Sequence, residues 1–257
     1  MKSESHLIKL VLFDIGGVLI DSGKYINKPA TEGLCDKLNK ELSLFLKNKS
    51  SERQHLTMSS IEQCIDDARS HYKSVRTERQ PMISAYVKNL LLEQMNFVPS
   101  KQELHMILNL FAEIEIRPFK PEAKLFIQNI HKSGIPWGIV ANTMWPSNAW
   151  RSKIRAEFTQ CPPSVAVWST DMGYRKPNPL MIIHACKSVG VPEANTIYIG
   201  NKDVTDMAAC SRAGVQGVLL TDKVKLLSHL MPVDNPNPYL IVTSLQDLEQ
   251  QWMYSPQ

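Results

Sequence analysis

The carboxyl-terminal half of the chain alternates short apolar segments with amphipathic ones, and this alternation restricts the fold more than any other feature. Strands are predicted at 136–143, 164–170, 195–200 and 215–221, and helices at 122–134, 148–158, 177–190 and 204–214, followed by a last strand and helix within 239–252. Strands that alternate with helices form a parallel sheet covered on both faces. The pattern therefore predicts an α/β fold with a doubly wound, Rossmann-like parallel sheet.

A further apolar segment, Ile8–Phe13, stands alone near the amino terminus and leads directly into Asp14. Gly16 and Gly17 follow, which indicates a buried strand that ends in a tight loop. The segment is shorter than the ~18 apolar residues of a membrane span. Because it is also not followed by a small-residue cleavage site, a buried strand is favoured over a signal peptide.

Glycine almost disappears between residues 22 and 117, and apolar residues recur there near the helical period. Helices are predicted at 34–48, 59–75, 82–95 and 100–114. Ser100 and Glu103 have the spacing of a capping box at the start of the last helix. We therefore predict an α/β core formed by 1–21 and 118–257, with a helical domain, 22–117, inserted after the first strand.

Composition restricts which binding partners and which cellular compartment are expected for the protein. The formal net charge is +4 with scattered Lys and Arg residues, which predicts no nucleic-acid partner. No apolar stretch is long enough to predict a membrane partner. Five dispersed cysteines without CxxC spacing indicate reduced thiols in a cytoplasmic protein, and no zinc site; they are Cys35, Cys64, Cys161, Cys186 and Cys210.

Polar residues follow the predicted strands where each one ends. Because ligands of open parallel sheets bind outside the carboxyl ends of the strands, these residues are expected to share one site. A carboxylate, a lysine and an acidic loop suit an anionic substrate, since they supply a nucleophile, a cation and ligands for Mg²⁺. The residues are Asp14 after the first strand, Asn142 and Thr143 after the second, Lys176 after the third, and Asn201, Asp203 and Asp206 after the fourth.

Structural roles are alternatives for several of these residues. Asp203 is expected to cap the following helix rather than to bind a metal. Asp206 could instead complement the dipole of that helix. Gly16 and Gly17 could serve backbone conformation alone.

Four segments, VLFDIGGVLID, GIVANT, GYRKPNP and YIGNKDVTDMAACSRAG, resemble in this order the four motifs of the haloacid dehalogenase-like (HAD) hydrolase superfamily. The helical insert resembles the C1-type cap of that superfamily. The resemblance covers the whole core. It implies a hydrolase, and most directly a Mg²⁺-dependent phosphatase of a small phosphorylated metabolite.

The resemblance also implies roles for single residues. Asp14 matches the nucleophile that forms an aspartyl-phosphate, and Lys176 matches the lysine that holds the phosphate and the nucleophile. Asp14, the backbone carbonyl of Gly16, Asn201 and Asp206 match the Mg²⁺ ligands. The cap would close over the site, exclude water and select the leaving group.

Three further residues are placed by the resemblance at the phosphate: Gly17, Asn142 and Thr143 are expected to bind substrate. Three positions depart from the pattern of a working phosphatase. Gly16 occupies the place of a second aspartate that acts as acid and base. Ala141 replaces a hydroxyl residue, and Asn201 replaces the first aspartate of the metal loop.

These departures leave two alternatives to the phosphatase. One is a catalytically silent member whose core is kept as a binding or regulatory module. The other is metal-independent carbon–halogen hydrolysis, as in the dehalogenase branch of the superfamily. That branch lacks the second aspartate and tolerates an asparagine in the last motif, but its aromatic residue two positions after the nucleophile is absent here.

Overall fold

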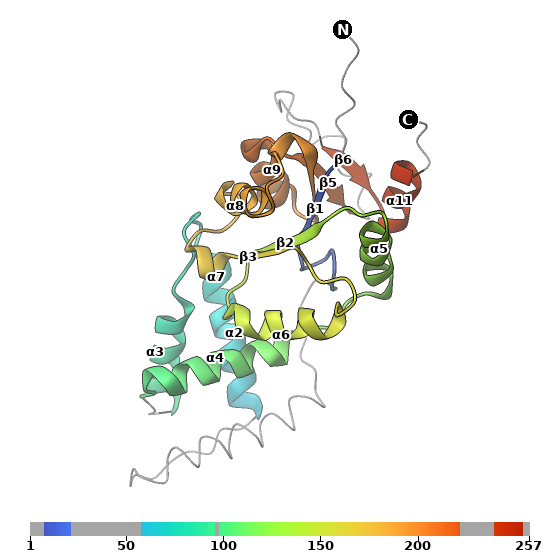
Figure 1. Cartoon of the computed structure of the whole chain (residues 1–257). Helices are drawn as coiled ribbons and strands as arrows, with labels where there is room; N and C mark the ends of the chain where they lie inside the picture. The colour runs from blue at the N-terminus through green and yellow to red at the C-terminus, as the bar shows by residue number, and fades with distance from the viewer. Residues whose placement is uncertain (1–7, 22–57, 96–97, 222–238, 254–257) are drawn as a thin grey trace. The chain divides into compact units, whose positions relative to one another are not determined.

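The computed structural model describes residues 8–21, 58–95, 98–221 and 239–253 (Figure 1). The chain divides into an α/β unit and a helical unit. The α/β unit comprises 1–23, 118–142 and 154–257, and the helical unit comprises 24–117 and 143–153. This division differs from the predicted boundaries in assigning 143–153 to the helical unit. The boundary near residue 21 stays a prediction, because 22–57 lie outside the described residues.

A six-stranded parallel sheet forms the centre of the α/β unit (Figure 1). Its strand order is β3-β2-β1-β4-β5-β6, so that β1 lies in the middle between β2 and β4. The predicted doubly wound α/β fold is confirmed. The strands are β1 (Leu10–Phe13), β2 (Trp137–Ala141), β3 (Val165–Trp168), β4 (Thr196–Gly200), β5 (Gln216–Leu220) and β6 (Leu240–Val242).

Side chains of β1 alternate between two buried layers, which is why its sequence is apolar at every position. Leu10 and Leu12 belong to the apolar cluster that includes residues of α8 (Leu180–Val189) and α9 (Ala208–Ala213). Phe13 points to the other layer, where its ring meets Phe126 of α5 (Pro121–Lys132) edge-on, with 6.1 Å between ring centroids. A strand buried on both faces is typical of a parallel sheet between helices.

Helices cover both faces of this sheet (Figure 1). α5 and α11 pack against each other in one layer, and α8 and α9 in the other. A short π-helical turn, Asp203–Met207, leads into α9. The helices of the unit are α5 (Pro121–Lys132), α7 (Ser169–Met172), α8 (Leu180–Val189), α9 (Ala208–Ala213) and α11 (Leu245–Met253), with a 3₁₀ turn at Glu193–Asn195; α6 (Ser147–Glu157) passes from the helical unit into it.

The helical unit contains α2 (Met58–Ser74), α3 (Ile83–Met95) and α4 (Lys101–Glu115). The predicted capping box is confirmed, because the Ser100 hydroxyl accepts from the Glu103 amide at 3.2 Å and the Ser100 amide donates to the Glu103 carboxylate at 2.6 Å. Trp145 joins this unit by packing edge-on against Phe111, with 5.8 Å between ring centroids. The helix predicted at 34–48 lies outside the described residues.

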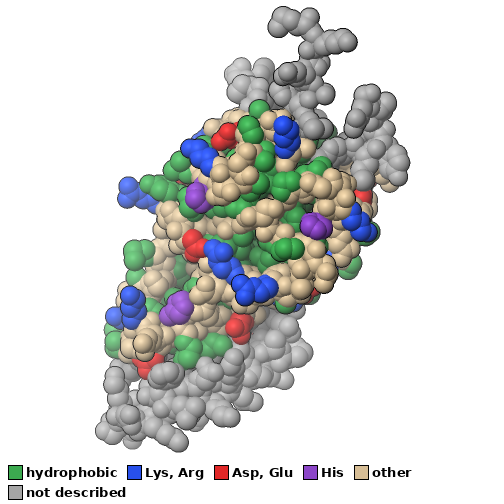
Figure 2. Space-filling model, in the orientation of Figure 1, with side chains coloured by type: hydrophobic (Ala, Val, Ile, Leu, Met, Phe, Trp, Pro, Cys, Tyr) green, Lys and Arg blue, Asp and Glu red, His purple; other side chains and the backbone are tan. Residues whose placement is uncertain are grey.

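Cys64, Cys161, Cys186 and Cys210 are buried free thiols, whereas Cys35 lies outside the described residues. No helix in the described part of the chain is long and apolar enough to span a bilayer. On the face shown in Figure 2, Lys and Arg side chains are spread among apolar, neutral and acidic ones and form no extended patch of one sign. The predicted absence of a nucleic-acid partner stays a prediction.

Candidate active site

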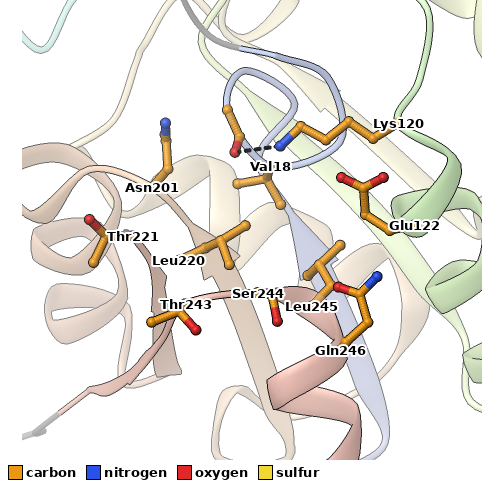
Figure 3. Close-up of a pocket in the computed structure, with 11 residues that line it drawn as sticks. Val18, Lys120, Glu122, Asn201, Leu220, Thr221, Thr243, Ser244, Leu245 and Gln246 are labelled. Carbon is orange, nitrogen blue, oxygen red and sulfur yellow. Dashed lines mark hydrogen bonds between the residues drawn. The ribbon is translucent and has the colours of Figure 1, made fainter. Parts of the chain in front are cut away.

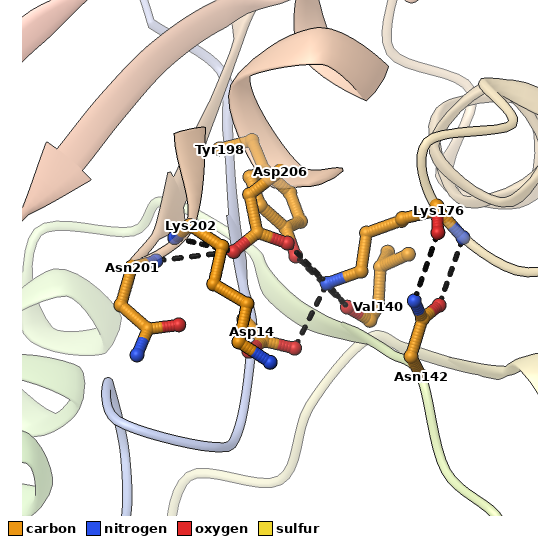
Figure 4. Close-up of polar contacts among 8 residues, drawn as sticks. All are labelled: Asp14, Val140, Asn142, Lys176, Tyr198, Asn201, Lys202 and Asp206. Atoms are coloured by element: carbon orange, nitrogen blue, oxygen red, sulfur yellow. Dashed lines mark hydrogen bonds and ion pairs between the residues drawn. The ribbon is translucent and has the colours of Figure 1, made fainter. Parts of the chain in front are cut away.

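Three ionisable side chains meet at the carboxyl edge of the sheet (Figure 4). Lys176 Nζ lies 2.8 Å from Asp14 Oδ1 and 2.8 Å from Asp206 Oδ1. Their exposed fractions are 2%, 7% and 1% for Lys176, Asp14 and Asp206. The structure therefore brings together residues from three of the predicted strand ends, as the parallel topology requires.

The position of Asp14 follows from the pairing of β1. Its backbone amide donates to the carbonyl of Ile199 at 2.9 Å, which continues the β1–β4 ladder by one residue. The carboxylate consequently stands at the end of the central strand, where its main chain is held by the neighbouring strand.

Lys176 is surrounded by protein oxygens. Besides the two carboxylates, Nζ contacts the carbonyl of Val140 at 3.1 Å and the hydroxyl of Tyr198. The Tyr198 hydroxyl donates to the same carbonyl at 3.0 Å, so its oxygen is available to accept from the ammonium. An ammonium has three protons, and four acceptors already surround this one.

Tyr198 is a site residue that sequence reasoning missed. It lies in the apolar strand β4 and is fully buried, so the sequence pattern does not distinguish it from an aromatic residue of the core. Its ring also lies 5.0 Å from Lys176 Nζ. Only the packing of β4 beside β1 reveals the contact.

Burial and charge act against each other on these groups. Burial raises the pKa of Asp14, and the charge of Lys176 opposes this rise. Burial alone would lower the pKa of Lys176, but Asp14 and Asp206 together raise it above its usual value. Burial, followed by the charges of Asp206 and Asp14, raises the pKa of Tyr198. Lys176 therefore stays protonated, and the Tyr198 hydroxyl keeps its proton.

Asn142 holds the backbone of Lys176. Its Nδ2 donates to the Lys176 carbonyl at 3.0 Å, and its Oδ1 accepts from the Lys176 amide at 2.8 Å. Thr143, the next residue, belongs to the helical unit, where its hydroxyl accepts from the Trp145 amide at 3.2 Å. The substrate contacts predicted for Asn142 and Thr143 stay predictions.

Both carboxylate oxygens of Asp206 are engaged. Oδ1 faces Lys176, and Oδ2 accepts from the amides of Asn201 and Lys202 at 3.1 and 3.0 Å. A Cβ at Gly200 would lie 2.5 Å from the Asp206 Cβ, so this close approach requires glycine. Asp206 organises the loop, and its predicted role as a metal ligand stays a prediction.

The cap predicted for Asp203 is wrong. The turn Asp203–Met207 is preceded by Lys202 as its capping residue and has no side-chain cap. Asp203 instead accepts a hydrogen bond from the Tyr239 hydroxyl at 2.8 Å. A partner 36 positions away, next to the start of β6, thus binds the carboxylate that was expected to cap the local backbone.

The two glycines after Asp14 differ. Gly17 has a φ of 83°, and a Cβ there would lie 1.9 Å from Asn201 Nδ2, so the loop requires glycine. Gly16 has no such φ, and a Cβ would meet nothing within 4 Å. The alternative that the backbone conformation requires glycine is therefore confirmed for Gly17. At Gly16 neither the conformation nor the space requires glycine.

Asn201 and Lys176 lie on opposite sides of Asp14 (Figure 4). Its Oδ1 is buried and has no hydrogen-bond partner among the described residues. Lys202 extends from the same loop toward Asp14, whose pKa its positive charge lowers (Figure 4). Within the described residues, no group of three or more His, Cys, Asp or Glu side chains is arranged to hold a metal ion.

A polar cavity of about 450 Å³ adjoins the site (Figure 3). It shares Gly17 and Asn201 with the site. Lys120 lines it and donates to the Gly17 carbonyl at 3.4 Å. The remaining lining residues come from the loop after β1, the start of α5, the ends of β5 and β6, and the start of α11: Val18, Glu122, Leu220, Thr221, Thr243, Ser244, Leu245 and Gln246.

Known proteins with similar sequences or folds were compared with this chain. A phosphoglycolate phosphatase of Xylella fastidiosa (strain 9a5c) is 26% identical over 120 residues, which are 44% of this chain and 46% of that protein. The match thus spans about half the length of this relative.

Solved structures share the fold at low identity. A 2-haloacid dehalogenase of Pseudomonas syringae pv. Tomato DC3000 is 17% identical, with a TM-score of 0.57 over 95% of this chain and 97% of that chain. A HAD-hydrolase of Bacillus subtilis, described as bound to magnesium, is 16% identical, with a TM-score of 0.57 over 95% of this chain and 98% of that chain.

The family model for haloacid dehalogenase-like hydrolases matches residues 8–214, which is well over half of the chain. The matched region contains Asp14, Lys176 and the loop from Asn201 to Asp206. The chain therefore belongs to the haloacid dehalogenase-like hydrolase family.

Proposed function

We propose that this hydrolase is a phosphatase of a small phosphorylated metabolite, with Asp14 as nucleophile and Mg²⁺ as cofactor. The observation that carries the proposal is the buried Asp14–Lys176–Asp206 cluster, with both carboxylates 2.8 Å from one ammonium. The named relative that acts on a phosphate ester supports the same reaction class. We also propose that the helical unit is a C1-type cap, and that the protein works in the cytoplasm.

Asp14 would attack phosphorus and form an aspartyl-phosphate, which water then hydrolyses. Lys176 keeps one oxygen of Asp14 in place and offsets part of its charge, because its ammonium stays protonated in this environment. Asp206 and Asn142 hold Lys176 from its side chain and its backbone. A buried, preorganised arrangement of this kind stabilises charge that develops during reaction.

The residues present can accommodate Mg²⁺, although few of the ligands that they offer are negatively charged. The buried, unpartnered Oδ1 of Asn201 is an oxygen ligand of the kind that Mg²⁺ accepts, and Asp14 supplies a carboxylate. Gly16 would add its backbone carbonyl. Bound there, Mg²⁺ would withdraw charge from the phosphoryl oxygens. Both oxygens of Asp206 are already engaged with other groups. Asp14 is therefore the one carboxylate that we expect to contact Mg²⁺ directly.

The test is phosphate release from an aryl phosphate by the purified protein, with Mg²⁺ and with EDTA. We expect Mg²⁺-dependent release from the wild type, a phosphorylated Asp14 detectable by mass spectrometry after acid quenching, and loss of both in Asp14→Asn. Release that persists in Asp14→Asn would remove this residue from the nucleophile role. Absence of release from every phosphate ester, with no stabilisation by Mg²⁺ and phosphate, would favour the catalytically silent alternative.

A second candidate is metal-independent carbon–halogen hydrolysis. The neutral amide of Asn201, which stands where a carboxylate would attract a cation more strongly, favours it. It predicts halide release from a 2-haloacid that EDTA does not inhibit. The same assay on Asp14→Asn separates it from a contaminating activity.

A further inference from the structure

The polar cavity next to the candidate active site belongs to one unit of the chain. All of its described lining residues come from the α/β unit (Figure 3). It shares Gly17 and Asn201 with the site, so it begins beside the place proposed for the phosphoryl group. Its volume of about 450 Å³ lies within the ~300–1,000 Å³ of pockets that bind small molecules. The cavity therefore has room for the part of a substrate that is not phosphate.

Glu122, in the first turn of α5, places a carboxylate in the wall of this cavity (Figure 3). The side chain is partly buried and forms no hydrogen bond or ion pair with another described residue. The dipole of α5 stabilises a carboxylate at this position, but its oxygens remain able to accept hydrogen bonds from a ligand. Glu122 is thus an acceptor that a ligand in the cavity can use.

Lys120, the other charged residue of the lining, is already matched by oxygens of the chain. Its Nζ donates to the Gly17 carbonyl at 3.4 Å and lies 3.9 Å from a carboxylate oxygen of Asp21. The charge of Glu122 is therefore the less compensated of the two. Because like charges repel, the cavity disfavours a leaving group that carries a second anion, such as a carboxylate.

Neutral polar groups from the start of α11 add donors and acceptors to the walls. Ser244 Oγ accepts from the Asp247 amide at 3.0 Å, so its proton can be donated to a ligand. The Thr243 hydroxyl donates to the Asp247 carboxylate, so its oxygen can still accept. The amide of Gln246 can do both. The walls thus suit a ligand with several groups that each donate and accept.

Apolar side chains lie between these polar groups in Figure 3, and they are Val18, Leu220 and Leu245. A sugar or another polyol matches this mixture, because its hydroxyls donate and accept while its carbon atoms present apolar surface between them. An alkyl group would leave the carboxylate of Glu122 without a partner. A simple amine would pair with Glu122 but would leave the hydroxyl and amide groups unused.

We propose that this cavity holds the leaving group of the substrate, and that this group is a polyhydroxylated alcohol without a second anion. The inference rests on the proposed phosphatase function. Glu122 accepts hydrogen bonds from the hydroxyls of the ligand, and Ser244 and Gln246 complete the set. Selection among phosphate esters then occurs in the α/β unit, in addition to any selection by the helical unit.

The first experiment measures kcat/KM of the wild type with Mg²⁺ on esters that share the reacting group. Sugar phosphates (ribose 5-phosphate and glucose 6-phosphate) are compared with pentyl phosphate, phosphoglycolate and phosphoethanolamine. We expect the better sugar phosphate to exceed each of the other three by at least about tenfold, because its leaving group alone satisfies the polar walls without a charge.

Two kinds of failure are distinguishable. Pentyl phosphate, phosphoglycolate or phosphoethanolamine performing as well as the sugar phosphates overturns the inference, and so does hydrolysis of an aryl phosphate alone. In both cases the proposed function stands. Hydrolysis of no phosphate ester overturns the proposed function, and the leaving-group role of the cavity with it.

The second experiment tests Glu122 itself. In Glu122→Leu we expect the ratio of kcat/KM between the better sugar phosphate and pentyl phosphate to fall about tenfold, because an acceptor is lost. Glu122→Gln keeps an acceptor without charge, so most of this ratio should remain while the discrimination against phosphoglycolate weakens. Gln128→Leu, at an exposed position of α5 outside the cavity, is the matched control and should keep the wild-type ratios.

Unchanged ratios in both Glu122 variants contradict the inference. A circular dichroism melt of each variant reports whether it folds. If a Glu122 variant does not fold, the wild-type series still decides between the polyol and the other leaving groups.

Discussion

At the scale of single residues, the loop after β4 determines the charge of the site. Asn201 contributes a buried but neutral oxygen, and Lys202 adds a positive charge that acts on Asp14. Asp206 is oriented by two backbone amides and by Lys176. Because affinity for a divalent cation depends on the number of charged ligands, we expect the proposed Mg²⁺ site at this loop to bind weakly.

Asn201→Asp tests this reading of the loop. The substitution adds a carboxylate where the unpartnered oxygen now lies, and we expect Mg²⁺ to bind about tenfold more tightly in isothermal titration calorimetry. Asp203→Asn is the matched control, because it removes a carboxylate of the same loop that is paired with Tyr239. An unchanged or weaker affinity in Asn201→Asp would place the metal elsewhere.

The two glycines after Asp14 show how much can be inferred from residue types alone. Gly17 is required by its φ and by the amide of Asn201, whereas Gly16 is not. In the sequence the two glycines look equivalent. Only the coordinates show that the backbone requires glycine at position 17 and does not require it at position 16.

At the scale of elements, the helical unit contains a partly buried polar network between α2, α4 and the segment after β2. Glu115 forms an ion pair with Arg69, and its second oxygen accepts from Trp145 Nε1 at 2.6 Å. Arg69 also pairs with Asp66 at 2.7 Å. Burial raises the pKa of Glu115, and Arg69 opposes this rise. The network joins residues 143–153 to the helices.

Glu115→Gln tests how the contribution of Glu115 to the free energy of unfolding changes with pH. A carboxyl group whose pKa is raised by folding contributes stability below its unfolded pKa, here about 4.5, and that contribution is lost as the pH rises through the folded value. The free energy of unfolding of the wild type, measured relative to Glu115→Gln, should therefore decrease from pH 4 toward neutrality. Urea unfolding followed by far-UV circular dichroism measures it. An increase with pH would mean that Arg69 outweighs burial.

The strands and helices themselves were largely predictable. Every predicted strand from Trp137 to Leu220 is present, as is the capping box at Ser100. Apolar periodicity reports which side chains are buried, and that information is local. The cap predicted at Asp203 was wrong because its carboxylate instead accepts a hydrogen bond from a tertiary partner, the Tyr239 hydroxyl.

At the scale of the whole molecule, ligand binding should be visible as stability. A ligand that binds only the folded state raises the free energy of unfolding by ~2.7 kcal/mol at a hundred times its Kd. For a chain of this size that corresponds to a rise of about 5 °C or more in the melting temperature. The midpoint therefore reports site occupancy without a known substrate.

We expect Mg²⁺ and inorganic phosphate together to raise the melting temperature of the wild type by about 5 °C, measured by differential scanning calorimetry. Asn201→Leu removes the unpartnered oxygen while keeping a similar volume, and the part of the shift that depends on Mg²⁺ should disappear in it. If the full shift persists in Asn201→Leu, the metal does not use this loop oxygen.

The sequence by itself predicted the α/β class, the helical insertion after the first strand and the edge of the sheet where the site lies, because the hydrophobic period and the succession of strands and helices along the chain depend on neighbouring residues. Only the tertiary structure decided which atoms meet. Lys176 and Asp14 are 162 positions apart, and the carbonyl of Val140 and the hydroxyl of Tyr198 reach the same ammonium from two further strands. Such contacts arise from the packing of strands side by side, which no local pattern of letters encodes.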